Sequence, residues 1–197
     1  MKDKVYLFDL DGTLISTELL PVIGAELGVF DEINELTKAT MAGEVPFDQS
    51  FRHRVELLAD VPIERVAEII LAQPVHEELM EWVLAKRDSC CVVTGNLDCW
   101  VNPWLKKHGL RGFTSTSDIT SGRLKVTTVL HKASVLSYFP GFKSIFIGDG
   151  ANDSEIMRSA DISIACSLIH PASQVLLEVA DYLVMEESSL CRLLSRL

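Results

Sequence analysis

The sequence lacks an apolar run long enough to cross a membrane. Its best stretch, from Leu19 to Phe30, is interrupted by Pro21 and Glu26, whereas a spanning helix needs about 20 consecutive apolar residues. The first residues lead into only a short apolar run before Asp9, which is not the pattern of a secretory signal peptide. These absences argue against a membrane protein and against a secreted one, and we expect a cytoplasmic protein.

Cysteine and basic residues are also scarce. The 197 residues include five cysteines and no Cys-x-x-Cys pair, so neither a disulfide framework nor a zinc site of the usual spacing is expected. Lys and Arg number 18 against 28 Asp and Glu, which gives a net charge of −10. Nucleic acids and anionic membranes bind basic surfaces, so we expect neither as a partner. The sequence leaves the oligomeric state open.

The chain does contain short apolar runs that alternate with helical patterns. This alternation predicts an α/β fold, a doubly wound (Rossmann-like) parallel sheet with helices on both faces. The adjacent Cys90 and Cys91 are expected on opposite faces of one strand. The expected strands are 5–8, 90–93, 144–147, 162–165 and 182–185. The expected helices of this part are 75–87, 98–109, 131–139, 152–160, 172–179 and 187–196, with local breaks at Pro103 and Gly122.

Residues 15–74 depart from the alternation. They carry helical periodicity and almost no strand pattern. An insertion after the first strand of such a sheet lies above the carboxyl ends of the strands, where ligands bind. We therefore expect a core domain of residues 1–14 and 75–197 and a small helical cap domain of residues 15–74. The helices expected in the cap are 17–28, 31–43, 47–58 and 63–72.

Polar side chains gather where three of the predicted strands end. Asp9 and Asp11 follow the first strand, Thr94 and Gly95 end the second, and the segment Gly148-Asp149-Gly150-Ala151-Asn152-Asp153 follows the third. The four aspartates of these segments would repel one another at a shared edge unless a cation neutralised them. Carboxylate oxygens suit Mg²⁺, which keeps some of its waters and binds substrate phosphate. The pattern therefore predicts a Mg²⁺ site.

The same motifs resemble those of the haloacid dehalogenase-like phosphatases. Asp9-Leu10-Asp11-Gly12-Thr13 is similar to the first family motif, Thr94 to the second, Lys132 to the third and Gly148 to Asp153 to the fourth, in the family's order. The resemblance implies a phosphomonoester hydrolase that works through an aspartyl-phosphate intermediate. A carboxylate that attacks phosphorus would split hydrolysis into two easier steps.

The resemblance also implies a role for each matching residue. Asp9 would be the nucleophile, and Asp11 would protonate the leaving alcohol and then activate water, with Lys132 beside them. The residues implied to bind phosphate oxygens or substrate are Thr94, Gly95, Lys132 and Asn152. The implied Mg²⁺ ligands are Asp9, the backbone carbonyl of Asp11, Asp149 and, beside them, Asp153.

Helical spacing supports two of these assignments independently. Lys132 precedes Val135 and Leu136 by three and four residues, which places it on the apolar face of a helix. Asp153 stands in the same relation to the apolar residues that follow it. A surface lysine would avoid such a face, although a snorkelling lysine is the alternative.

A second charged residue falls on an apolar face in the expected cap. Phe47, Phe51 and Val55 share one side of helix 47–58, and Arg54 lies within about 20° of Phe47 at 100° per residue. A buried arginine needs an anion because an unpaired buried charge is costly. That anion is either a substrate or a carboxylate of the cap itself.

The cap narrows the resemblance to the phosphoserine phosphatase branch. Glu18 lies nine residues after the predicted nucleophile, and Met41-Ala42-Gly43 precedes the stretch that contains Arg54. By this likeness Glu18 would accept a substrate ammonium, Arg54 would pair with its carboxylate, and Met41 and Phe47 would wall the pocket. Two positions depart from the branch: Gly12 replaces Ser or Thr, and Asn96 replaces the second glycine of Ser-Gly-Gly.

The sequence is compatible with three hypotheses about function. The first is a Mg²⁺-dependent phosphatase acting on L-phosphoserine, or a phosphatase or phosphotransferase for another small phosphorylated metabolite. The second is a receiver-like signalling module that carries a long-lived phosphoaspartate. The third is a catalytically silent binding protein that has kept the pocket. Asp11 and the inserted cap favour the enzyme, because a receiver needs neither an acid nor a capped pocket.

Overall fold

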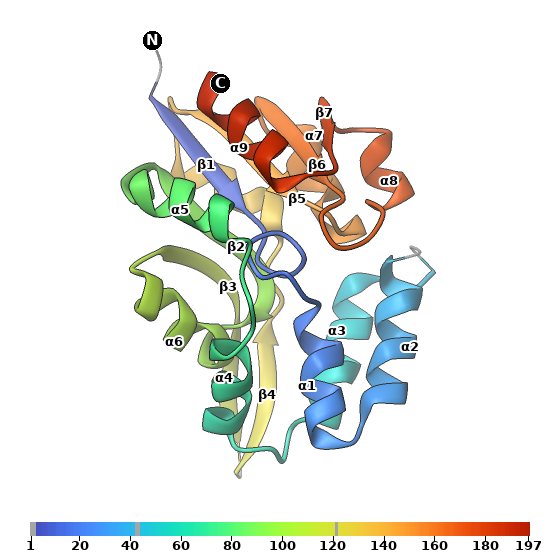
Figure 1. Ribbon diagram of the computed structural model, residues 1–197. Coiled ribbons are helices and arrows are strands. Elements are labelled where there is room, and N and C mark those ends of the chain that lie inside the picture. Colours follow the sequence, from blue (N-terminus) through green and yellow to red (C-terminus); the bar gives the residue numbers. More distant parts are fainter. Residues whose placement is uncertain (1–2, 42–43, 121) are drawn as a thin grey trace.

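A seven-stranded sheet forms the centre of the protein (Figure 1). The computed structural model describes residues 3–41, 44–120 and 122–197. The strand order is β4-β3-β2-β1-β5-β6-β7, and all neighbouring pairs are parallel except β3 and β4. The strands are β1 (Lys4–Phe8), β2 (Cys90–Leu97), β3 (Arg111–Thr120), β4 (Arg123–Thr128), β5 (Lys143–Gly148), β6 (Ile162–Cys166) and β7 (Tyr182–Val184). The predicted doubly wound α/β fold is confirmed.

Helices cover both faces of the sheet, and four of them come from the insertion after β1 (Figure 1). Those four are α1 (Leu19–Leu27), α2 (Phe30–Met41), α3 (Phe47–Leu57) and α4 (Ile63–Leu71). The others are α5 (Glu77–Ala85), α6 (Asp98–His108), α7 (Ser154–Ser159), α8 (Gln174–Leu177) and α9 (Glu187–Arg196), with 3₁₀ turns at Arg87–Ser89, Lys132–Tyr138 and Ala151–Asp153. No helix in the described ranges combines the length and the apolar character that crossing a bilayer requires. The division into a core and a cap domain stays a prediction.

Alternating side chains of the central strands fill two separate apolar cores. Tyr6 and Phe8 of β1 belong to the larger core, whereas Leu7 belongs to the smaller one on the other face. Cys90 and Cys91 divide between the two cores in the same way, as the two-residue period of a strand requires. Their predicted placement on opposite faces is confirmed.

Strand register brings the predicted motifs to one edge of the sheet. Phe8 pairs with Val92 of β2 and with Ile147 of β5, and the backbone N–H of Asp9 donates to the carbonyl of Ile147 at 2.8 Å. Asp9 is therefore flanked by the ends of β2 and β5. Parallel pairing thus assembles at one place residues that are far apart in the sequence.

A β-hairpin of β3 and β4 is present where the sequence analysis expected no strand. Its residues are rich in Thr and Ser, and Gly122 with a φ of 80° lies in its turn. β-branched residues flanking a turn glycine are a hairpin signal, which the polar composition masked. The hairpin docks on the insertion: the N–H of Leu124 donates to the carbonyl of Ala59 at 3.1 Å.

Several expected helices are wrong in type or length. Residues Lys132–Tyr138 form a 3₁₀ helix, in which Ser134 and Ser137 donate to carbonyls three residues back at 2.7 Å. Such side-chain bonds compete with the α-helical ladder. Pro103 lies inside α6 instead of breaking it. The helix expected over 172–179 is only Gln174–Leu177, and the end of the one expected over 31–43 lies outside the described residues.

The buried cysteines should resist alkylation in the folded protein. Burial raises the pKa of Cys90 to about 12, which at neutral pH leaves about a thousandfold less thiolate than an ordinary thiol has. Iodoacetamide at neutral pH should therefore leave Cys90, Cys91 and Cys166 unmodified, while all five cysteines react in guanidinium. Peptide mass spectrometry measures this, and rapid native labelling of Cys90 would contradict the buried placement.

Candidate active site

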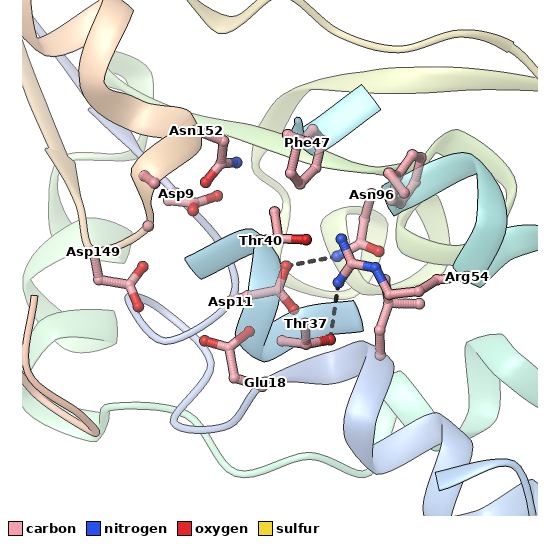
Figure 2. A pocket seen from close by; sticks show the side chains of 15 residues that line it. Asp9, Asp11, Glu18, Thr37, Thr40, Phe47, Arg54, Asn96, Asp149 and Asn152 are labelled. Carbon is pink, nitrogen blue, oxygen red and sulfur yellow. Dashed lines mark hydrogen bonds between the residues drawn. The ribbon is translucent and has the colours of Figure 1, made fainter. Parts of the chain in front are cut away.

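One cavity at the carboxyl ends of the strands collects most of the predicted site residues (Figure 2). Lys132 and Asp153 do not line it, but Nζ of Lys132 lies 2.8 Å from Oδ1 of Asp9 and 2.6 Å from Oδ1 of Asp153. Thr94 is fully buried and does not line it either. The side chain of Met41, expected in the wall, lies outside the described part of the chain. The predicted residues that line the cavity are Asp9, Asp11, Glu18, Phe47, Arg54, Gly95, Asp149 and Asn152.

The carboxylate of Asp9 is anchored through one of its two oxygens. Oδ1 accepts a hydrogen bond from the N–H of Leu10 at 2.7 Å and lies 2.8 Å from Nζ of Lys132. Among the hydrogen bonds of the described residues, none uses Oδ2. The anchoring of one oxygen therefore leaves the other available as a nucleophile.

Lys132 is buried between two carboxylates, as helical spacing predicts. Its Nζ donates to Oδ1 of Asp153 at 2.6 Å, and the residue is only 4% exposed. Burial alone would lower the pKa of Lys132, but Asp153 and Asp9 together raise it above its usual value. The ammonium stays charged and compensates part of the negative charge of the site.

Asp149 carries a buried oxygen that accepts no hydrogen bond from the described residues. Its Oδ1 accepts a long bond from the hydroxyl of Thr13 at 3.4 Å, whereas Oδ2 accepts no hydrogen bond of good geometry but lies 3.0 Å from Nε2 of His170. Burial raises the pKa of this carboxyl to about 6, against the opposing effect of His170. Gly12, with a φ of 66°, lies so close to Asp149 that a Cβ would collide with it, which explains the glycine in the first motif.

The carboxylate set fits a hard divalent cation. One oxygen each from Asp9, Asp149 and Asp153 lies within 4.8 Å of the other two, and all three residues are buried. Unpaired buried oxygens in such a group are stabilised by a cation. Oδ2 of Asp149 is a candidate ligand atom, because it accepts no hydrogen bond and has the imidazole of His170 beside it, whereas both oxygens of Asp153 already accept hydrogen bonds, from Lys132 and from the N–H of Gly150 at 3.2 Å.

Asp11 stands beside Asp9 in an environment that suits an acid. Its Oδ1 accepts the N–H of Leu19 at 3.0 Å. Its pKa is raised well above the usual value, first by burial and then by the neighbouring charges of Glu18 and Asp9. A carboxyl with a raised pKa can hold a proton near neutral pH and deliver it to a leaving group.

The end of β2 is held by one hydrogen bond within the strand and by one from β3. The N–H of Asn96 donates to Oγ1 of Thr94 at 3.1 Å, and the carbonyl of Gly95 accepts from the hydroxyl of Ser115 at 2.6 Å. A Cβ on Gly95 would collide with the ring of Phe47. A glycine is therefore needed where α3 of the insertion rests on this loop.

Arg54 points into the cavity, as predicted, and is 5% exposed. Its Nη1 donates to the hydroxyl of Thr37 at 3.0 Å, its Cζ lies 5.9 Å from the centre of the Phe47 ring, and its Nη2 is buried without a partner among the described residues. Burial lowers the pKa of Arg54 to about 10, so it remains charged at neutral pH. No salt bridge of Arg54 is found in the described residues, which disfavours the alternative of an internal ion pair.

Glu18 is paired with a histidine that the sequence analysis missed. Nε2 of His170 lies 3.0 Å from Oε1 of Glu18 and 3.0 Å from Oδ2 of Asp149, and its hydrogen bond is directed at Glu18. The carboxylates of Asp149, which has the larger effect, and of Glu18 raise the pKa of His170 to about 10. His170 follows β6, and its position after a strand of the sheet was the one signal that could have indicated it.

Comparison with known proteins places the chain in a family. The model for haloacid dehalogenase-like hydrolases matches residues 6–158. The chain belongs to this family. Because relatives and similar structures are phosphoserine phosphatases, this haloacid dehalogenase-like hydrolase is a phosphoric monoester hydrolase, and the readings as a signalling module and as a silent binding protein are set aside.

Individual relatives resemble this hydrolase over nearly its whole length. It is 32% identical to the phosphoserine phosphatase of Methanocaldococcus jannaschii over 91% of each chain. A substrate-bound phosphoserine phosphatase complex superimposes with a TM-score of 0.81 at 29% identity, covering 100% of this chain and 99% of the other. A phospho-aspartyl intermediate analogue of phosphoserine phosphatase gives 0.79 at 28% identity, covering 98% and 99%.

Replacing Asp149 tests the metal assignment. Asp149→Asn removes a charge from the proposed Mg²⁺ ligand, so the Kd for Mg²⁺ should rise at least about tenfold, and activity should recover poorly at high Mg²⁺. Binding is measured by calorimetry and by the Mg²⁺-dependent rise of Tm. Asp88→Asn, at an exposed position preceding β2, is the control. Near-normal turnover of Asp149→Asn in chelated buffer would contradict the assignment.

Replacing the two neighbouring aspartates separates their roles. Asp9→Asn should bind substrate and transfer nothing, because no acyl phosphate can form. Asp11→Asn should be slowed by about 10²–10⁴-fold, yet it should release about one equivalent of phenol from an activated aryl phosphate and keep the phosphoryl group on Asp9. Rapid-quench kinetics and mass spectrometry of the Asp9 peptide measure this, and phosphate found on Thr13, Ser16 or a histidine would contradict it.

Proposed function

We propose that this hydrolase converts L-phosphoserine to L-serine with Mg²⁺. The observation that carries the proposal is Nη2 of Arg54, a buried donor with no partner among the described residues, in the same cavity as Asp9. An unpaired buried guanidinium nitrogen is costly, and a substrate carboxylate would satisfy it with a charge-assisted hydrogen bond. A substrate that reaches both residues has a phosphate at one end and a carboxylate at the other.

The opposite charge in the cavity suits an ammonium. Glu18 lines the same cavity, and its Oε1 is held by His170 while none of the hydrogen bonds of the described residues uses Oε2. One cation and one carboxylate complement the zwitterionic end of an amino acid. Relatives named phosphoserine phosphatase, such as that of Methanocaldococcus jannaschii, support the same substrate.

The first half of the reaction transfers the phosphoryl group to the enzyme. Oδ2 of Asp9 attacks phosphorus, the bond from phosphorus to the seryl oxygen breaks, and Asp11 gives its proton to that oxygen. Lys132, Gly95 and Asn152 would stabilise the charge of the phosphoryl oxygens, since this reaction depends mainly on positioning and on electrostatic stabilisation. Held by Asp9, Asp149, Asp153 and the backbone carbonyl of Asp11, Mg²⁺ would supply further neutralisation of that charge.

The second half returns the enzyme to its starting state. Asp11, now ionised, takes a proton from water, and the water oxygen attacks phosphorus. The acyl phosphate breaks to inorganic phosphate and the free carboxylate of Asp9. An alcohol in place of water would make the enzyme a phosphotransferase, and another small phosphorylated metabolite with a carboxylate remains the alternative substrate.

A phosphate-release assay with Mg²⁺ tests the substrate directly. The panel contains L-phosphoserine, phosphothreonine, phosphohomoserine, phosphoglycerate and sugar phosphates, and kcat/KM should be highest for L-phosphoserine. A clear preference for a sugar phosphate, which has no carboxylate for Arg54, would overturn the proposal.

Replacing Arg54 tests the carboxylate contact. Arg54→Ala should cost about 2–5 kcal/mol of transition-state binding for phosphoserine, or about 30-fold to several thousand-fold in kcat/KM. A simple aryl phosphate has no carboxylate and should lose much less. Arg196→Ala, at an exposed position of α9, is the matched control. Equal losses on both substrates would instead assign Arg54 a structural role.

A further inference from the structure

The carboxylate of Asp11 is held from two parts of the chain at once. Its Oδ1 accepts the backbone N–H of Leu19, the first residue of α1 in the insertion, at 3.0 Å. Its Oδ2 accepts Nδ2 of Asn96, at the end of β2 in the sheet, at 2.6 Å (Figure 2). Two donors of different origin therefore fix the orientation of this side chain.

Asn96 is itself rigidly placed. It is 4% exposed and lines the cavity. Its own N–H is bonded to Oγ1 of Thr94, and the preceding carbonyl, of Gly95, is bonded to Ser115. A side chain carried on so fixed a segment has few alternative positions, and its amide nitrogen can determine where Asp11 lies.

The amide suits this task because it does not exchange protons with the carboxyl group. An asparagine nitrogen only donates hydrogen bonds, so it orients Oδ2 without competing for the proton that Asp11 must give and take. Misplacing a reacting group by about 1 Å can slow a reaction about 100-fold. The phosphoserine phosphatase branch has a glycine at this position, so the contact belongs to this chain.

We propose that Asn96 is a positioning residue that holds Asp11 in place for proton transfer to the leaving oxygen and from water. The inference rests on the acid–base role of Asp11 within the proposed function. Asn96 acts only through Asp11, and its contribution is largest for substrates whose leaving group needs a proton.

The experiment uses Asn96→Leu, which keeps a similar volume and removes the donor, and Asn96→Gly, which introduces the residue of the branch and avoids any packing conflict. With L-phosphoserine, kcat should fall about 10–100-fold, while KM should change by less than about threefold if Asn96 acts only through Asp11. With 4-nitrophenyl phosphate, rapid mixing should give a burst of about one equivalent of nitrophenol at nearly the unmodified rate, followed by slow turnover. Asn102→Leu, at an exposed position of α6, is the matched control and should leave both rates unchanged.

A double variant isolates the path through Asp11. If Asn96 acts only by positioning Asp11, then Asp11→Asn combined with Asn96→Leu should be no slower than Asp11→Asn alone. Multiplying losses would overturn the inference. Equal slowing of the burst and of phosphoserine turnover would also overturn the inference, because it would indicate that the phosphate-binding end of β2 is disturbed. Full activity of both Asn96 variants would overturn it as well.

Failure of the proposed function is distinguishable from failure of this inference. If Asp11→Asn turns over normally, then Asp11 is not the acid–base group and both are wrong. If Asp11→Asn is slow and the Asn96 variants are fast, only the inference is wrong. If the substrate panel shows that another alkyl phosphate is preferred, that compound replaces phosphoserine in the assay. The test of Asn96 is then unchanged.

Discussion

The ammonium of Lys132, buried between Asp9 and Asp153, is the interaction on which the site depends. Four aspartates and Glu18 meet at the end of a sheet whose interior is apolar, and their repulsion would oppose folding. Lys132 compensates two of these charges at distances of 2.8 and 2.6 Å. Both contacts use Oδ1 atoms, and Oδ2 of Asp9, on the cavity, accepts no hydrogen bond from the described residues.

The remaining carboxylates of the site are stabilised partly by other residues of the protein and partly by the metal ion and substrate that would bind there. His170 pairs with Glu18 and lies against Asp149, and Asn96 and Leu19 bond the two oxygens of Asp11. Within the described part of the chain, Nη2 of Arg54 has no hydrogen-bond partner, and Oδ2 of Asp149 has the imidazole of His170 beside it but accepts no hydrogen bond. A metal ion and a carboxylate-bearing phosphate ester have the complementary charges.

Much of this arrangement could be predicted from sequence because it follows from local rules. Asp9 and Asp149 lie directly after apolar strands, and the shared edge of a parallel sheet brings them together. Lys132 and Arg54 lie on apolar faces of helices, so their burial followed from spacing alone. His170 and the contact between Asn96 and Asp11 could not be predicted in this way. His170 reaches a residue 152 positions away through a loop whose path no periodicity describes. The Thr- and Ser-rich hairpin looked like a loop in the sequence because most of its residues are exposed.

That hairpin makes the proposed substrate recognition by Arg54 depend on two segments that are distant in the sequence. Arg123 of β4 pairs with Glu56 and Asp60 at and after the end of α3, at 3.0 and 2.8 Å, and the carbonyl of Val126 accepts from Arg52 at 3.0 Å. α3 is the helix that carries Arg54, so its angle over the cavity is set partly by the sheet edge. If residues 15–74 were replaced by those of a relative, the grafted segment would pack against the hairpin of this chain instead of its own. The arginine that corresponds to Arg54 would then be oriented by contacts that differ from those in the relative. If Arg54 binds the substrate as proposed, changing the specificity of this chain by exchanging residues 15–74 would require exchanging the hairpin as well.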